Sequence, residues 1–231
     1  MCGRFVLNAD SKAIQQAFDL TNLPDKLMPR FNIAPTQPVG VITNHDPRSL
    51  QYFRWGLVPF WAKDSDIGSR MINARSETLQ DKPSFKHAYR KRRCLIPATG
   101  FYEWKQTDDG KQPYFIHLKE QPVFAFAGLW ESWDNPEGET LRTFTIITSD
   151  PNDLVKPLHN RMPVILRRDD YDMWLSPDDL PPDALTPLLR PYDADSMDAY
   201  PVSTQVNSPR NDAPDLIEPL DNTPPSQPSL L

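Results

Sequence analysis

Short apolar runs, separated by turn residues, set the hydrophobic pattern of the chain. Runs of this length that are rich in branched and aromatic residues are typical of β-strands. We predict strands at Arg4–Leu7, Val39–Thr43, Leu50–Trp55, Tyr114–Leu118, Val123–Leu129, Thr143–Thr148 and Val164–Leu166. Helical periodicity is rarer and predicts helices at Lys12–Phe18, Ser84–Lys91, Asp169–Leu175 and Asp183–Leu189. Asp10 or Ser11 can cap the first helix, and Pro83 can open the second.

Strands outnumber helices and do not alternate regularly with them, which excludes a doubly wound parallel sheet. The pattern predicts an α+β fold, with a mixed or antiparallel, barrel-like sheet and a few short flanking helices. The 26 prolines against 8 glycines indicate short, stiff connections. The 231 residues suit one domain, which we expect at residues 2–220. The Pro- and Ser-rich segment 221–231 is expected to be a disordered tail.

Charge is distributed unevenly along the chain. The total is −6, a value that taken alone argues against nucleic-acid binding. Residues 169–231 hold 13 acidic and 2 basic residues, a net of −11, which leaves +5 for residues 1–168. A basic body can bind a polyanion because the local field matters more than the total. The alternative, to which we give equal weight, is that the acidic segment is a solvated tail and that the charge distribution has no role in binding.

Composition excludes several classes of protein. Two cysteines, Cys2 and Cys94, cannot form a disulfide framework, and the 4 histidines lie too far apart to suggest a zinc site. We therefore expect no metal and no cofactor, with Cys94 a small buried apolar residue. The longest apolar run, Val123–Trp130, is too short to span a bilayer, and the N-terminus lacks a signal-peptide pattern. We expect a cytoplasmic protein with reduced thiols and no membrane partner.

Cys2 follows Met1 directly, so removal of Met1 would leave a cysteine with a free α-amine beside its thiol. This pair condenses with an aldehyde to an imine, and the thiol then closes a thiazolidine ring. An α-amine with a pKa of about 7.7–8.0 is about one quarter neutral near neutral pH, and a thiol near 8.5 is about one tenth thiolate. Because Gly3–Val6 resembles the start of a strand, we expect Cys2 at the edge of the core rather than in a frayed terminus.

Four further segments place polar residues among aromatic and apolar neighbours. They are Arg30–Pro35, Trp55–Trp61 leading to Ile72–Thr78, Cys94–Trp104, and Thr148 followed by His159–Pro163. A carboxylate among aromatics, as Glu103 is, has a raised pKa and exchanges protons near neutrality, and His159 titrates there unaided. Asn73 can orient a hydroxyl or carbonyl, arginines match phosphate, and tryptophans stack on unpaired bases. Taken singly, each residue also fits an ordinary structural role; together they predict a site.

Six motifs occur in a fixed order along the chain. They are Met1–Phe5, Asn32–Pro35, Trp55–Trp61, Asn73–Thr78, Arg93–Trp104 and His159–Pro163. Together they resemble the SRAP family, the SOS-response-associated peptidase-like proteins, from residue 1 to about Pro219. The resemblance implies a protein that senses abasic sites in single-stranded DNA. It would trap the ring-opened aldehyde as a thiazolidine and thereby shield the lesion from strand cleavage.

The resemblance also implies roles for individual residues. Cys2 matches the crosslinking residue, Asn73 the asparagine that orients the adduct, and Glu103 and His159 the acidic residue and histidine of the site. We expect His159 to protonate the sugar oxygen as the ring opens and Glu103 to take a proton from the α-amine, with the reverse division open. The residues expected to contact DNA are Arg4, Pro35, Trp61, Arg75, Trp104, Thr148 and Arg161.

Two other functions fit the same residues. Cys2 with His159 and Asn73 or Glu103 also suits a thiol hydrolase, or a peptidase that removes its own Met1. A non-covalent binder of single-stranded nucleic acid would need only the basic and aromatic residues. If an imine forms, weak lyase activity is expected beside the crosslink. No self-complementary apolar surface is legible, so we expect a monomer.

Overall fold

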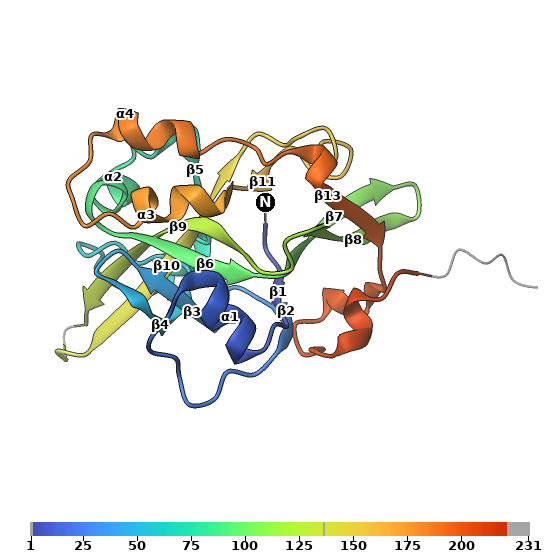
Figure 1. The fold of residues 1–231 in the computed structure, drawn as a ribbon, viewed down its shortest axis with the longest axis horizontal. Helices are drawn as coiled ribbons and strands as arrows, with labels where there is room; N and C mark the ends of the chain where they lie inside the picture. The colour runs from blue at the N-terminus through green and yellow to red at the C-terminus, as the bar shows by residue number, and fades with distance from the viewer. Residues whose placement is uncertain (1, 136, 221–231) are drawn as a thin grey trace, which may run out of the picture.

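Five strands close into a mixed barrel at the centre of the molecule (Figure 1). The computed structural model describes residues 2–135 and 137–220. The barrel strands are β3 (Pro38–Thr43), β4 (Asp46–Trp55), β6 (Arg93–Ala98), β9 (Phe124–Asp134) and β10 (Thr140–Ser149). β10 pairs with β4 in parallel and with β9 antiparallel, and the antiparallel pairs β4–β3, β3–β6 and β6–β9 complete the ring.

Three short strands extend the barrel at its edges. They are β5 (Asn73–Arg75), β11 (Met162–Pro163) and β12 (Ile165–Leu166). β5 pairs in parallel with the second half of β10, β11 pairs with the end of β10, and β12 pairs with β9. β10 therefore lies between two chain segments from distant parts of the sequence, β5 and β11.

A second, antiparallel sheet lies against the barrel. Its strands, in spatial order, are β13 (Met197–Pro201), β8 (Gly110–Leu118), β7 (Gly100–Thr107), β1 (Phe5–Leu7) and β2 (Arg30–Ile33). Phe5 of β1 joins the two parts, because its ring meets Trp55 and Phe126 of the barrel edge-on, at centroid distances of 5.2 and 5.7 Å. This contact fixes the direction in which the chain enters β1 from Cys2.

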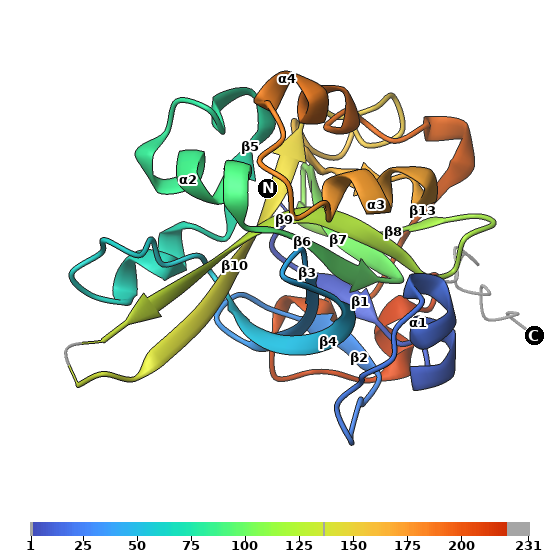
Figure 2. The same cartoon turned by 60° about the vertical axis from the view of Figure 1, so that its left-hand side comes forward.

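Short helices cover the outside of the barrel (Figure 2). The α-helices are α1 (Ser11–Phe18), α2 (Pro83–Lys91), α3 (Tyr171–Trp174) and α4 (Pro182–Leu185). The 3-10 helices are η1 (Asp66–Arg70), η2 (Ser76–Thr78), η3 (Arg168–Asp170), η4 (Thr186–Leu188), η5 (Ala194–Ser196), η6 (Thr204–Asn207) and η7 (Pro214–Ile217). As predicted, Asp10 caps α1, accepting from the N–H of Ala13 at 2.7 Å, and Pro83 opens α2.

The chain from residue 202 to residue 220, which we call the C-terminal strap, crosses the second sheet beside β1 and β2 (red in Figure 1). It closes a small core of its own on that sheet. The buried side chains of this core are Val6, Tyr102, Phe115, Val202, Val206 and Leu216. The acidic C-terminal region is therefore partly a structural element and not merely a solvated tail.

The structure confirms the predicted α+β class with a barrel-like sheet and few short helices. The sequence pattern missed β2, β6, β7 and β13, because polar residues or prolines interrupt their alternation. It also missed β5 and β11, which are only three and two residues long. Cys94 is buried in the core, as expected. The predicted disordered tail at 221–231 lies outside the described residues. Among the residues that the structure describes, no helix is long and apolar enough to cross a membrane.

Candidate functional site

Cys2 is fully buried where the chain enters β1. The side-chain amide of Asn73 donates to the carbonyl oxygen of Cys2 at 2.9 Å, and the thiol lies 3.9 Å from the carbonyl oxygen of Arg4. Asn73 begins β5 and is itself held opposite Ile146 of β10. The N-terminal cysteine is thus held at the edge of the core, as the sequence predicts, by an asparagine of the predicted site.

The environment of Cys2 disfavours the thiolate form of its side chain. Burial raises the pKa of the Cys2 thiol far above its ordinary value, and the negative charge of Glu103 raises it further. The expectation of about one tenth thiolate is therefore wrong, because it took a solvated cysteine as its reference. A base must remove the thiol proton before the sulfur can attack.

Glu103 lies in β7, which runs beside the N-terminal segment because the N–H of Tyr102 donates to the carbonyl oxygen of Arg4 at 3.0 Å. Its side chain is only 2% exposed. Burial raises the pKa of Glu103 to about 7, and the positive charge of the amino terminus opposes this shift in part. The predicted rise is confirmed, so Glu103 can exchange a proton near neutral pH.

His159 lies in the loop before β11. Its Nδ1 accepts from the backbone N–H of Arg161 at 3.0 Å. Burial lowers the pKa of His159 below its ordinary value, and the positive charge of the amino terminus lowers it further. When Nδ1 accepts this hydrogen bond, the neutral imidazole has its proton on Nε2, where it can serve as a donor. Nδ1 also lies 3.3 Å from the carbonyl oxygen of Arg161, a contact that suits the other tautomer.

Arg75, Thr148 and Arg161 are brought together by β10. Thr148 is opposite Arg75 in the β5–β10 register, and the guanidinium of Arg161 donates to the carbonyl oxygen of Thr148 at 2.7 Å. Arg161 also pairs with Glu77 at 2.8 Å and with Asp150 at 3.0 Å. Neither carboxylate was among the predicted site residues, although Glu77 lies within the Asn73–Thr78 motif.

These three residues and Asn73 form what we call the β5–β10 cluster. Three of its buried polar atoms have no hydrogen-bond partner among the described residues: Oδ1 of Asn73, Oγ1 of Thr148 and Nε of Arg161. A buried polar atom without a partner costs free energy, so such atoms at one place indicate a ligand. The cluster offers both donors and an acceptor.

Arg4 and Trp104 lie on the other side of the N-terminal segment, against the C-terminal strap. Arg4 donates to Oδ1 of Asn32 at 2.8 Å and to the carbonyl oxygens of Val206 at 2.6 Å and Asn207 at 3.1 Å. Nε1 of Trp104 donates to Oδ1 of Asn207 at 2.7 Å. A phosphate at Arg4 would share the guanidinium with these contacts, and the predicted DNA contact of Arg4 stays a prediction.

Asn32 and Asp212 complete this second group. The buried amide of Asn32 donates to the carbonyl oxygens of Val206, Ser208 and Asn211 at 3.2, 3.0 and 2.8 Å. Asp212 accepts from the N–H of Asn32 at 3.0 Å. Arg4, Asn32, Trp104, Asn207 and Asp212 are called the strap cluster below. Asn32 belongs to the Asn32–Pro35 motif, but no role was predicted for it. Nothing in the sequence indicated a role for Asn207 or Asp212.

Pro35 and Trp61 lie on two separate loops. Pro35 is half-buried in the turn between β2 and β3, and the indole of Trp61, after β4, is 50% exposed. Trp61 lines a groove of about 390 Å³ with Phe60 and the basic face of α2, including Lys86 and Arg90. Exposed aromatic rings beside cations are suited to stacking on single-stranded bases.

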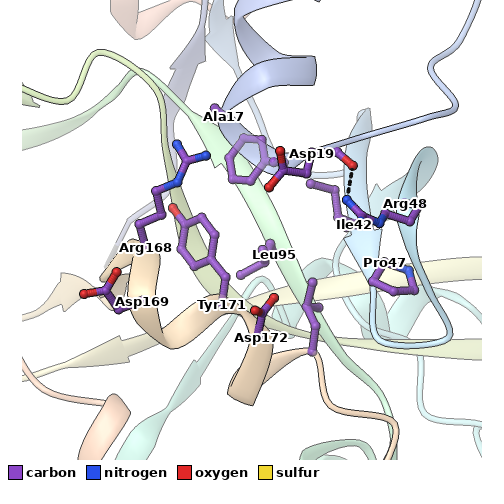
Figure 3. A pocket seen from close by; sticks show the side chains of 12 residues that line it. Ala17, Asp19, Ile42, Pro47, Arg48, Leu95, Arg168, Asp169, Tyr171 and Asp172 are labelled. Atoms are coloured by element: carbon purple, nitrogen blue, oxygen red, sulfur yellow. Dashed lines mark hydrogen bonds between the residues drawn. The ribbon is translucent and has the colours of Figure 1, made fainter.

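A polar cavity of about 570 Å³ lies apart from these residues, between α1, the β3–β4 hairpin and α3 (Figure 3). Apolar Leu95 and the carboxylates of Asp19, Asp169 and Asp172 line it, and Arg48 donates to the carbonyl oxygen of Asp19 at 2.6 Å. The predicted site residues are absent from its walls. Across residues 2–135 and 137–220, no three His, Cys, Asp or Glu side chains group closely enough to hold a metal.

The fold and site define a mixed-barrel protein with a buried cysteine at the start of its first strand. Residues 1–209 match the family profile described as SOS response associated peptidase (SRAP). The chain belongs to the SRAP family.

Named relatives and a solved structure support this assignment. The chain is 50% identical over 222 residues to the abasic site processing protein YoqW of Bacillus subtilis, covering 94% of this chain and 99% of that relative. Identity to the abasic site processing protein HMCES of Gallus gallus is 39% over 198 residues, covering 75% of this chain and 58% of that one. A crystal structure of a protein from Bacteroides thetaiotaomicron has a TM-score of 0.86 at 30% identity, covering 94% and 99% of the two chains.

Proposed function

We propose that the protein processes abasic sites in single-stranded DNA by forming a covalent crosslink through Cys2. The relatives named abasic site processing proteins support the substrate. The observation that carries the chemistry is the way Cys2 is held. The carbonyl oxygen of Cys2 accepts a hydrogen bond from Asn73 at 2.9 Å. The negative charge of Glu103, a carboxyl group with a pKa of about 7, raises the pKa of the Cys2 thiol.

The reaction begins once Met1 is removed and the α-amine of Cys2 is free. The amine nitrogen attacks the aldehyde carbon of the ring-opened deoxyribose, and one water leaves as the imine forms. The sulfur of Cys2 then adds to the imine carbon, and the thiol proton ends on the ring nitrogen. No oxidant or reductant is required. Asn73 supports both steps by fixing the backbone from which amine and thiol project.

Glu103 and His159 divide the proton transfers. Glu103, with its pKa of about 7, accepts a proton from the α-ammonium and returns it to the hydroxyl group that leaves as water. Once deprotonated again, it takes the proton of the buried thiol and passes it to the ring nitrogen. His159 carries its proton on Nε2 and donates it to the sugar oxygen as the ring opens. If the two roles are reversed, His159→Ala slows the imine step and Glu103→Gln slows ring opening. A substrate that already presents the open aldehyde distinguishes the two cases, because it bypasses ring opening and shows only the defect in the imine step.

The β5–β10 cluster is suited to the DNA backbone near the lesion. The Thr148 hydroxyl and Arg161 Nε, which have no hydrogen-bond partner among the described residues, can donate to a phosphate oxygen, and Arg75 is exposed beside them. Trp61 and Pro35 offer apolar surface to flanking bases. Because an abasic site has no base to read, these contacts recognise the backbone and the aldehyde rather than a sequence.

A thiol-peptidase function gains no support from the site. The thiol of such an enzyme needs a lowered pKa, whereas burial raises the pKa of the Cys2 thiol. A single self-cleavage of Met1 is a separate step, and the mass of the Glu103→Gln chain tests it. Retained Met1 in that variant would indicate autoprocessing.

The proposal is tested by mixing the protein with single-stranded DNA that carries one abasic site and running a denaturing gel. We expect a shifted band with the wild-type chain and none with Cys2→Ala. Cys2→Ser keeps the amine without the thiol, so it should lose the stable adduct and cleave more strand through the imine. A shifted band that survives both substitutions would refute the crosslink through Cys2. Less cleavage by Cys2→Ser than by wild type would contradict the order of imine before ring.

A further inference from the structure

Asn207 of the C-terminal strap contacts two of the residues that are expected to bind DNA. Its side chain contacts one of them, and its backbone contacts the other. Oδ1 of Asn207 accepts from Nε1 of Trp104 at 2.7 Å, and the carbonyl oxygen of Asn207 accepts from Nη2 of Arg4 at 3.1 Å. Asn207 ends η6 and is exposed, so core packing does not explain its side chain. One strap residue therefore links Trp104 of β7 to Arg4, the residue before β1, at the surface.

Trp104 is suited to being positioned in this way. It is half-buried at the rim of the second core, and its ring meets Tyr102 at a centroid distance of 6.5 Å and an angle of 48°. Packing on Tyr102 leaves part of the indole exposed. A hydrogen bond at Nε1 fixes the remaining rotation of the ring, because the indole N–H is the only polar group that the side chain can use.

The strap itself is firmly held at this point. The buried Asn32 amide binds three strap carbonyl groups, and Arg4 binds two. The backbone of Asn207 is thus held in place, so its side chain is a fixed hydrogen-bond acceptor for Trp104. A preformed stacking surface binds more tightly than a mobile one, since less side-chain entropy is lost on binding.

We propose that Asn207 is a positioning residue that fixes Trp104, beside Arg4, as a stacking platform for a nucleotide next to the lesion. This inference rests on the proposed function, because it takes single-stranded DNA as the ligand. It makes the C-terminal strap part of the DNA-binding site. The residue acts through Trp104 and does not itself touch the reacting atoms.

The test uses oligonucleotides that carry a tetrahydrofuran analogue of the abasic site, which has no aldehyde, so that binding is measured without chemistry. One oligonucleotide has adenines on both sides of the analogue, and the other has further analogues there. We expect wild type to bind the first at least fivefold more tightly in fluorescence anisotropy, because base stacking contributes. Asn207→Ala should reduce that preference to within about twofold.

Two controls separate positioning from a general structural role. Asn211→Ala removes a side-chain bond to Gln205 at 2.8 Å within the same strap and should leave the preference unchanged. Trp104→Phe removes the indole N–H, so adding Asn207→Ala to Trp104→Phe should change the affinity less than twofold. Equal weakening of both oligonucleotides by Asn207→Ala, or an undiminished effect in the Trp104→Phe background, overturns the proposal.

The outcome is distinguishable from failure of the proposed function. If wild type neither binds the adenine-flanked oligonucleotide nor crosslinks to a true abasic site, the proposed function fails and the inference falls with it. If wild type crosslinks and prefers flanking adenines while Asn207→Ala retains the full preference, only the role of Asn207 is refuted.

Discussion

Two groups of polar side chains flank Cys2, and they differ in how completely their hydrogen bonds are made. In the β5–β10 cluster, Asn73, Thr148 and Arg161 each keep one buried polar atom without a partner among the described residues. In the strap cluster, the side chains of Asn32 and Arg4 donate hydrogen bonds to backbone carbonyl groups of the strap. The first group is incomplete without a ligand, and the second is complete within the chain.

The difference shows that similar residue types can serve opposite purposes. Both groups contain an asparagine and an arginine from recognised motifs, so the sequence makes them look alike. A saturated network stabilises the fold, whereas unsatisfied buried groups lower stability until something binds. Substitution of Asn32 in the strap cluster and substitutions in the β5–β10 cluster should therefore separate stability from DNA binding.

The largest effect is expected from Asn32→Ala in the strap cluster. The substitution should lower the free energy of unfolding by about 3 kcal/mol, because it removes several buried hydrogen bonds and leaves their partners unpaired. Urea denaturation measures it. Asn22→Ala, which removes one partly buried bond to Ser49 at 3.1 Å, is the matched control with a cost of about 1 kcal/mol. Equal costs for the two variants would contradict the distinction.

Asn73→Ala should show the reverse profile. We expect the crosslinking rate at saturating DNA to fall about 100-fold, since the backbone of Cys2 loses the donor that orients it. The free energy of unfolding should change by less than about 1 kcal/mol, because the substitution also removes an unsatisfied buried oxygen. Single-turnover gels and urea denaturation measure the two quantities. A large loss of stability with an unchanged rate would place Asn73 with the structural residues.

Glu103→Gln tests the cost of a buried carboxyl group at the centre of the site. The folded-state pKa of about 7 lies above the ordinary 4.5, so the protonated form is favoured in the fold. Ionisation therefore removes stability as the pH rises from about 4.5 through 7. At about pH 8 the variant should be more stable than wild type by about 3 kcal/mol, with the gain vanishing near pH 4.

The same variant should crosslink more slowly, and the wild-type rate should fall as the pH drops through about 7. Thermal unfolding over a pH series and crosslinking rates at the same pH values provide the check. A variant whose stability advantage is independent of pH would show that Glu103 does not titrate in this range.

Thr148→Val is expected to have the smallest effect. Valine replaces an unpartnered buried hydroxyl, so stability should rise by about 1 kcal/mol while the affinity for single-stranded DNA falls about fivefold. Thr143→Val is the matched control, because the Thr143 hydroxyl accepts from the N–H of Val58 at 2.9 Å. The control should lose stability and keep its affinity. The same sign for both variants would remove the basis of the comparison.

Much of the fold follows from the sequence pattern. The strand-rich alternation predicts an α+β barrel, and the caps of α1 and α2 are legible from Asp10 and Pro83. β6 and β7 were missed as strands because their sequences mix proline, cysteine and charged residues that only pairing with β9 and β8 makes extended. Local propensity cannot foresee such tertiary pairing.

The candidate site is only partly legible from the sequence. A raised pKa can be anticipated where aromatic neighbours imply burial, as for Glu103. The protonated thiol of Cys2 could not be anticipated, because burial at a chain terminus depends on packing across the barrel. Nor could the role of Asn207, which lies 103 positions from Trp104 in an unremarkable acidic region.

The most direct test of the account is the mass of the DNA adduct and of the peptide that bears it. We predict an adduct with the mass of a chain beginning at Cys2 plus the DNA, less one water, with the DNA attached to the peptide that starts at Cys2. An adduct on another residue, or on a chain that still carries Met1, would contradict the central claim.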